Sequence, residues 1–319
     1  MFHKYLLPVL CLVLLSCGKE SKLEREIATI PVEVEIQRFD ERFARATPDS
    51  LGQLKMEFPY LFPSQYPDSM WVEMLGDSLH RELHQEVLTH YPELSGLEQE
   101  LEGLFQHIRY YFPNDSLPKT ITLVSQVDYQ NQVIWADSLM LVSLDTYLGE
   151  EHYFYEGMPL YLRSGFEEEY IVVDAAEAFG ALKVPRPVSR SFVDDLVYYG
   201  KLLYLKDLLI PFKEDHEKIQ YTKEELEWAK ANEEQIWRYF VERELIFSTD
   251  PQLGPRFLNP APFSKFYLEL DNEAPPRLGR YIGWQMVRQY VERTDEPLSE
   301  TLQKQGEVIF KESNYKPRR

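Results

Sequence analysis

Two histidines, His80 and His84, stand four residues apart in the segment HRELH. On a helix this spacing places both imidazoles on one face, where they can hold a zinc ion. A zinc peptidase, however, needs a glutamate directly after the first histidine, within reach of the metal-bound water. Arg81 occupies that position, and its charge opposes a metal cation. We therefore expect the pair to lie on a solvated helix face and to bind no metal.

Two carboxylates, Glu233 and Glu244, fall on the apolar face of a helix predicted over residues 222–247. That face is defined by Ala229, Ile236, Phe240 and Phe247. Because a buried carboxylate needs a partner, we expect a structural ion pair with Arg280 or Arg288 of another helix. The alternative is a general acid or base with a shifted pKa.

Gly279 and Gly283 stand four residues apart in a helix predicted over residues 278–293. Glycine inside a helix costs up to about 1 kcal/mol relative to alanine. The usual compensation is the close approach of another backbone, which we expect here. A site where a ligand docks is the alternative.

The N-terminus has the features of a lipoprotein signal. Lys4 is followed by an apolar stretch over residues 5–15, which is shorter than the roughly 20 residues that span a bilayer. The stretch ends in Leu-Leu-Ser-Cys-Gly, with a small residue directly before Cys17. We predict a signal peptide at 1–16, a lipid on Cys17 and a tether over residues 17–30. The alternative is an ordinary signal peptide with an incidental cysteine.

Familiar catalytic motifs are absent from the sequence. It has no Gly-x-Ser-x-Gly, no phosphate-binding glycine loop, no dinucleotide fingerprint and no His-Glu-x-x-His. The two cysteines are Cys11, which leaves with the signal, and Cys17, which becomes lipidated, so cysteine catalysis is excluded. We expect no enzymatic activity, no cofactor and no resident metal.

The formal net charge of -19 makes nucleic acid an unsuitable partner, because phosphate binding relies on clustered Lys and Arg. The hydrophobic periodicity predicts strands over 31–39, 120–127, 132–136 and 139–144, the last two forming a hairpin around Asp137-Ser138. It predicts helices over 40–46, 77–91, 97–110, 191–209, 222–247, 278–293 and 299–305, and one within 168–182. The fold class is α+β: a single, mostly helical domain over residues 31–319 with a small central sheet.

The sequence resembles the gliding motility lipoprotein GldB family of the Bacteroidota. The segments that carry the resemblance are 144–149 (LDTYLG), 158–162 (MPLYL), 199–204 (YGKLLY), 228–233 (WAKANE), 236–242 (IWRYFVE), 247–249 (FST), 261–264 (APFS), 279–285 (GRYIGWQ) and 313–318 (SNYKPR). They cover nearly the whole mature chain, and the predicted lipid attachment at Cys17 agrees with them.

That family is distantly similar to zinc peptidases of the gluzincin type, in which strands precede a His-Glu-x-x-His helix and a later helix supplies a glutamate. The corresponding stretches here are 172–182, which has no histidine, and 193–208, in which Tyr199 stands where the glutamate would be. The resemblance therefore implies a zincin-like fold, a degenerate metallopeptidase, with its zinc ligands lost.

The function implied by the resemblance is a lipid-anchored, non-enzymatic component of the gliding machinery, linked to type IX secretion and facing the periplasm. Its partners would be the membrane, through the lipid, and proteins of that machinery. The alternatives are an active hydrolase built around Glu233, Glu244 or the histidine pair, and a peptide- or glycan-binding lipoprotein outside motility. Candidate partner or groove residues are Tyr199, Glu233, Trp237, Arg238, Glu242, Gly279, Gly283 and Trp284.

Overall fold

The computed structural model describes residues 22–260, 266 and 273–318. The predicted signal peptide (1–16), Cys17 and the segment 261–264 lie outside these residues. Four strands form one sheet: β1 (Ile36–Arg38), β2 (Lys119–Leu123), β3 (Val133–Ala136) and β4 (Leu139–Ser143). The strand order is β1-β2-β4-β3, with β1, β2 and β4 parallel and β3 antiparallel to β4. The predicted hairpin is confirmed, and its turn residue Asp137 adopts a left-handed conformation.

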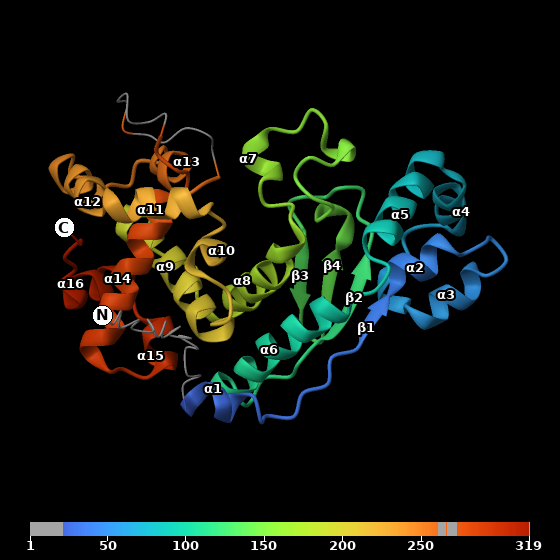
Figure 1. Cartoon of the computed structure of the whole chain (residues 1–319), viewed down its shortest axis with the longest axis horizontal. Coiled ribbons are helices and arrows are strands. Elements are labelled where there is room, and N and C mark those ends of the chain that lie inside the picture. The colour runs from blue at the N-terminus through green and yellow to red at the C-terminus, as the bar shows by residue number, and fades with distance from the viewer. Residues whose placement is uncertain (1–21, 261–265, 267–272, 319) are drawn as a thin grey trace, which may run out of the picture.

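Helices lie at both ends of the sheet and across it (Figure 1). Those that precede α8 are α1 (Lys22–Ile27), α2 (Phe39–Ala44), α3 (Leu51–Glu57), α4 (Asp68–Gly76), α5 (Ser78–His90), α6 (Ser95–Tyr111) and α7 (Leu160–Arg163). The others are α8 (Ile171–Lys183), α9 (Phe192–Leu209), α10 (Asp215–Ile219), α11 (Lys223–Ala231), α12 (Glu233–Glu242), α13 (Leu253–Phe257), α14 (Leu278–Thr294), α15 (Leu298–Gln303) and α16 (Gly306–Ser313). Short 3-10 helices lie at Pro59–Leu61, Leu144–Thr146, Tyr153–Tyr155 and Glu168–Tyr170. The α+β class is thus confirmed.

Period-2 alternation places the two faces of the sheet in different hydrophobic clusters. Met140 and Val142 of β4 belong to a large cluster with α6 and α8, in which Trp135 contacts Phe179 with ring centroids 5.2 Å apart. On the opposite face, Ile121 packs with residues of α2 and α3 in a smaller cluster. A third cluster joins α9 to the helices that follow it.

Helix α9 is buried around its whole circumference. Leu202 and Leu205 belong to the cluster of the sheet, whereas Leu196 and Leu203 belong to the C-terminal cluster. A helix that is apolar on all sides is typical of the interior of a large fold. α9 therefore joins the two halves of the core, and any polar side chain it carries must find partners in the interior.

Several sequence-based boundaries differ from the structure. The strand predicted over 120–127 ends at Leu123. The helix predicted over 222–247 breaks at Asn232, whose side chain donates to the Trp228 carbonyl and which separates α11 from α12. The strand predicted over 31–39 is ordered as a strand only at β1. The predicted short helix at 299–305 ends at Gln303, and α16 follows as a helix that the sequence analysis did not predict. Within the described ranges, no helix is both long and apolar enough to cross a bilayer.

Candidate functional site

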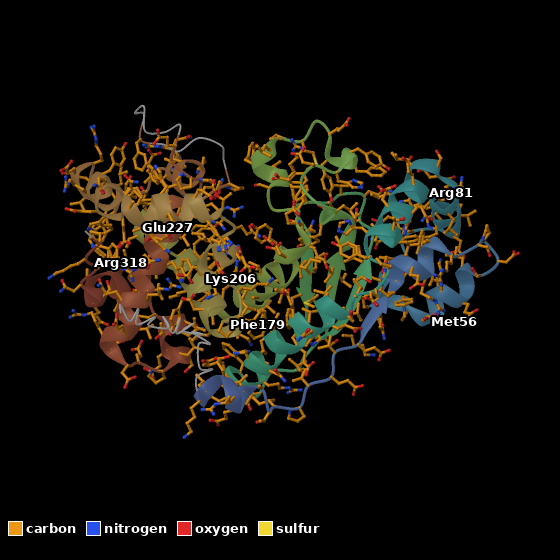
Figure 2. The ribbon with its side chains drawn as sticks, viewed as in Figure 1. Met56, Arg81, Phe179, Lys206, Glu227 and Arg318 are labelled. Carbon is orange, nitrogen blue, oxygen red and sulfur yellow. The ribbon has the colours of Figure 1, made fainter. Side chains whose placement is uncertain are left out.

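Charged side chains from three helices meet between the two large hydrophobic clusters. We call them the junction cluster: Asp174 and Glu177 of α8, Lys206 of α9, and Arg277 and Arg280 at the start of α14. Lys206 lies near the middle of the molecule, between the sheet and the C-terminal helices (Figure 2). Perturbed titratable groups that gather in this way are typical of functional sites, although structural ion pairs produce them too.

Lys206 is 1% exposed and holds the junction cluster together. Its Nζ donates to Glu177 Oε2 at 2.5 Å and to the Lys218 carbonyl at 3.0 Å. A second cation, Arg280, lies 3.7 Å from the other oxygen of Glu177. Burial alone would raise the pKa of Glu177, but these two cations outweigh it and lower that pKa to about 2. Glu177 is therefore ionised at any physiological pH.

The pKa of Asp174 is shifted in the opposite direction. Its carboxylate accepts from the Tyr147 hydroxyl and from the Gln220 amide, both at 2.8 Å. Burial raises its pKa to about 6, and the charge of Lys206 only partly opposes this shift. Two carboxylates one helical turn apart thus titrate at very different pH, a pattern that also separates acid and base roles in enzymes.

The two arginines of the junction cluster, Arg277 and Arg280, bind to backbone and side-chain groups of neighbouring segments. Arg277 has a left-handed backbone and donates to Gln220 Oε1 at 2.9 Å and to the Ile219 carbonyl at 3.3 Å. Arg280 donates to the Leu258 carbonyl at 2.6 Å, and its guanidinium lies 4.1 Å from the centre of the Tyr199 ring. The candidate residue Tyr199 therefore lies at this site, as a platform for a cation.

Trp284 joins a neighbouring ionic network. Its Nε1 donates to Asp207 Oδ2 at 2.8 Å, and the guanidinium of Arg288 lies 3.7 Å from the centre of its ring. Arg288 pairs with Asp207 at 2.7 Å and with Asp215 at 3.0 Å. The hydrogen bonds and charges of these two carboxylates raise the pKa of Arg288 even though burial opposes them. The guanidinium of Arg288 thus donates to Asp207 and Asp215, and Arg288 is not a partner of Glu233.

Glu233 is buried as predicted, but the predicted ion pair with Arg280 or Arg288 is wrong. Its oxygens accept from the hydroxyls of Tyr281 and Tyr315, both at 2.8 Å, and from the backbone N–H of Arg318 at 3.1 Å. The carboxylate therefore ties α12 to α14 and to the C-terminal residues. Glu244 is exposed and follows the end of α12, so it does not share the apolar face.

The expected close backbone approach at the two glycines of α14 is confirmed. A β-carbon on Gly283 would overlap the carbonyl of Leu196 in α9. A β-carbon on Gly279 would lie 2.9 Å from side chains of Leu196 and Leu258. These glycines serve the packing of α14 on α9.

The remaining candidates lie on α12. Trp237 is half-buried and contacts Tyr315 and Phe310, with ring centroids 5.0 and 5.9 Å away. Arg238 is exposed and pairs with Glu234 at 2.8 Å, and Glu242 is exposed as well. None of these three residues belongs to the junction cluster. Trp237 packs against the C-terminal residues, and Arg238 and Glu242 face solvent.

The histidine pair is buried, so the expectation of a solvated face is wrong. Phe43 of α2 stacks on His84 with ring centroids 5.5 Å apart. The two Nε2 atoms lie 3.2 Å apart, and His84 Nδ1 lies 3.1 Å from the carbonyl oxygen of Asp40. Since that oxygen only accepts, His84 carries its proton on Nδ1, and His80 donates to its Nε2. Burial lowers the pKa of both rings, that of His84 to about 4, so the pair is neutral at pH 7.

In the part of the chain that the structure describes, no group of three or more His, Cys, Asp or Glu side chains is placed to hold a metal ion. The junction cluster was missed by the sequence analysis, although a signal was present. Asp174 and Glu177 stand three residues apart in a helix that is otherwise largely apolar. Lys206 likewise stands among apolar residues of α9.

Fold and site together define an α+β protein whose central polar cluster is an ion-paired junction between helices. A family model described as gliding motility protein GldB matches residues 20–317, and the chain belongs to this family of gliding motility lipoproteins. Searches of curated proteins and of solved structures found no match. A lipoprotein family places the chain in the cell envelope.

Proposed function

We propose that this lipoprotein is a non-enzymatic component of the gliding machinery, linked to type IX secretion, whose folded part binds a protein partner as a degenerate peptidase domain. The lipid on Cys17 would hold it at the membrane, facing the periplasm. The order of elements supports this proposal, because the strands precede α8 and α9 follows it and packs against it. This is the order that the resemblance to gluzincins implies.

The observation that carries the proposal is the filled space between α8 and α9. The cavity lined there by Glu177, Tyr199 and Lys206 holds about 10 Å³. That volume is at the lower limit for a single water molecule. A zinc peptidase needs room for the ion, its water and the substrate carbonyl at this place.

The charge of this region also disfavours a metal. The ammonium of Lys206 and the guanidinium of Arg280 lie beside Glu177, a carboxylate in the stretch that corresponds to the metal-binding helix of the gluzincins. Both cations would repel a divalent ion. The Lys206 ammonium cannot move out of this space without breaking its hydrogen bond to the Lys218 carbonyl, which joins α9 to α10.

Metal analysis of the purified full chain tests the non-enzymatic part of this proposal. We expect well below one zinc per chain after gel filtration. One tightly held zinc per chain, together with peptidase activity that a chelator abolishes, would establish the hydrolase alternative instead.

Gene deletion tests the motility part. We expect the deleted strain to lose spreading on agar and the export of proteins through the type IX pathway, and the wild-type gene to restore both. Normal spreading and secretion in the deleted strain would favour a peptide- or glycan-binding lipoprotein outside motility. Crosslinking in intact cells, followed by pull-down, then identifies the partner.

A further inference from the structure

Helix α1, the first element that the structure describes, is docked on α6. Its residue Ile27 is fully buried. The side-chain amide of Gln106 in α6 donates to the Ile30 carbonyl at 3.2 Å, and Nε2 of His107 lies 3.0 Å from Glu24 Oε2. A helix of six residues is too short to be stable by itself. These contacts therefore hold α1 on the body of the protein.

The lipid that the proposed function assigns to Cys17 lies close to this docked helix along the chain. Lys22, the first residue of α1, follows Cys17 by five residues. A chain spans at most about 3.6 Å per residue, so Lys22 lies within about 18 Å of the acylated cysteine. A folded chain of this length has a radius of gyration of about 20 Å. The side of the molecule opposite α1 therefore cannot reach the same bilayer surface while α1 stays docked.

The ends of α6 and α8 lie on the same side of the molecule as α1. The residues that hold α1, Gln106 and His107, belong to the last third of α6. Phe112 directly follows α6, and its ring centre lies 5.2 Å from that of Phe179 and 5.5 Å from the ammonium of Lys183, the last residue of α8. Figure 1 shows α1 at the lower edge of the molecule and α7, α12 and α13 in its upper part.

Three large apolar side chains are exposed at the ends of α6 and α8. Tyr110 lies in the last turn of α6, one turn beyond the residues that hold α1. Leu182 lies in the last turn of α8, and Val188, in the loop that follows α8, is completely exposed. Tyrosine is favoured at the interface between membrane and water, and aliphatic side chains gain free energy when they leave water. A bilayer surface would therefore bind all three side chains favourably.

Charge contributes less to this surface. The end of α8 and the loop after it carry three cations, Lys183, Arg186 and Arg190, and no carboxylate. Lys183, however, contacts Asp115, and the charge of Arg186 opposes the rise that burial produces in the pKa of Asp195. A cation close to anionic lipid contributes about 1 kcal/mol. Because two of the three cations already lie near carboxylates, we expect apolar contact to dominate.

We propose that the membrane face of this protein, defined by Tyr110, Leu182 and Val188, lies against the lipid bilayer, and that the docking of α1 fixes this orientation. The inference rests on the lipid at Cys17, which is part of the proposed function. It adds that α7, α12 and α13 point away from the bilayer. The exposed charges of α12 are then presented to partners at a distance from the membrane surface.

Site-specific labelling of the full processed lipoprotein in vesicles tests this orientation. Cys11 leaves with the signal and Cys17 is acylated, so an introduced cysteine is the sole free thiol. Leu182→Cys and Val188→Cys place an environment-sensitive fluorophore on the membrane face. Leu160→Cys places it on α7, and this control is matched because Leu160 and Leu182 are 57% and 56% exposed.

The vesicles contain phosphatidylethanolamine and phosphatidylglycerol, with a nitroxide quencher on some of the headgroups. We expect the quencher to lower the fluorescence at positions 182 and 188 at least about twofold, because these labels enter the headgroup region. The fluorescence at position 160 should not change. Equal quenching at positions 160 and 182, or no quenching at either, overturns the orientation.

Flotation of the same vesicles distinguishes failure of the anchor from failure of the orientation. Protein that does not float with the vesicles lacks the lipid, which contradicts the anchor in the proposed function and this orientation together. Protein that floats without quenching at positions 182 and 188 contradicts the orientation alone and leaves the anchor in place.

Ile27→Asp tests the role of α1 in this orientation. A buried carboxylate without a partner should release α1 from α6, so quenching at position 182 should fall at least about twofold while the protein still floats. Ala28→Asp, at the exposed neighbouring residue, should leave quenching unchanged. The melting temperature of each variant shows that the body of the protein stays folded. Full quenching in a folded Ile27→Asp variant would show that the docking of α1 does not set the orientation.

Discussion

Gly200 of α9 and Gly283 of α14 lie back to back, so closely that a β-carbon on Gly200 would overlap the carbonyl group of Gly283. No side chain separates the two helices at this point. The contact sets the position of α14, and with it the positions of Arg277, Arg280 and Arg288 beside α9. The ion-paired junction therefore depends on two residues that carry no charge.

Gly283→Ala should destabilise the fold by at least about 3 kcal/mol, because the new methyl group meets backbone that cannot move without separating α9 from α14. Urea unfolding measures this loss. Gly52→Ala in α3 is the control: nothing lies within 4 Å of the added carbon, and alanine there should stabilise by up to about 1 kcal/mol. Equal effects of both changes would contradict the close approach.

Glu233→Ala should destabilise by about 3 kcal/mol or more. It leaves two buried tyrosine hydroxyls, those of Tyr281 and Tyr315, without their acceptor, and each such loss costs about 1–3 kcal/mol. The C-terminus should also detach, so chymotrypsin should cut after Tyr315 faster than in the wild type. Glu227→Ala, which removes an exposed ion pair on α11, should change neither quantity. An intact C-terminus in Glu233→Ala would argue against the network.

Long periodic patterns made part of this fold predictable. Helices α5, α6, α9 and α14 lie within two residues of the predicted ranges, because each repeats its apolar residues over three turns or more. The hairpin of β3 and β4 followed from alternation and a turn-forming aspartate. The break at Asn232 was not predictable in this way, since the apolar stripe continues through it and only a local side-chain bond marks it.

The polar interior depends on contacts between distant segments, and this limited the prediction of the site. Burial of Glu233 followed from its place on an apolar stripe, but its partners come from residues 48 to 85 positions away. The burial of His84 depends on α2, which covers the face of α5 that the sequence pattern predicts to be exposed to solvent. A pattern along one helix indicates which polar groups are buried, and only the fold decides what they meet.

The histidine pair predicts a loss of stability in mild acid. The unfolded chain protonates His84 at about pH 6.5, whereas the folded chain does so only near pH 4. Stability from this residue is therefore complete above pH 6.5 and falls as the pH drops towards 4, by at most about 3 kcal/mol at 1.36 kcal/mol per pKa unit. His84→Gln removes the titration, so the gap in unfolding free energy between the two proteins should change between pH 7.5 and 4. A gap that is constant with pH would show that the ring is hydrated.

Asp174 predicts the opposite slope. Its folded pKa of about 6 lies above the value of 3.8 for a free aspartate, so the native state holds the proton more tightly and loses stability as the pH rises through 6. Asp174→Asn keeps the shape and removes the charge. At pH 7 it should be more stable than the wild type by about 1–3 kcal/mol, with the difference vanishing near pH 4. Destabilisation at pH 7 would mean that the ionised carboxylate is needed by the cations of the junction cluster.

The exposed charges of α12 test whether this helix meets a partner. Trp237→Ala should cost about 2–3 kcal/mol, because it removes contacts with Phe310 and Tyr315 from a half-buried ring. Arg238→Ala and Glu242→Ala should change stability by no more than about 0.5 kcal/mol, since both side chains are exposed.

Returning each α12 variant to a strain that lacks the gene separates packing from recognition. We expect Trp237→Ala to reduce protein level and spreading together. We expect at least one of Arg238→Ala and Glu242→Ala to abolish spreading at a normal protein level and an unchanged melting temperature, because an exposed charge that contributes little to the fold can pair with a charge on another protein. Glu227→Ala on α11 is the exposed control and should spread normally. Normal spreading of both charge variants would restrict α12 to core packing and place the partner surface elsewhere on the molecule.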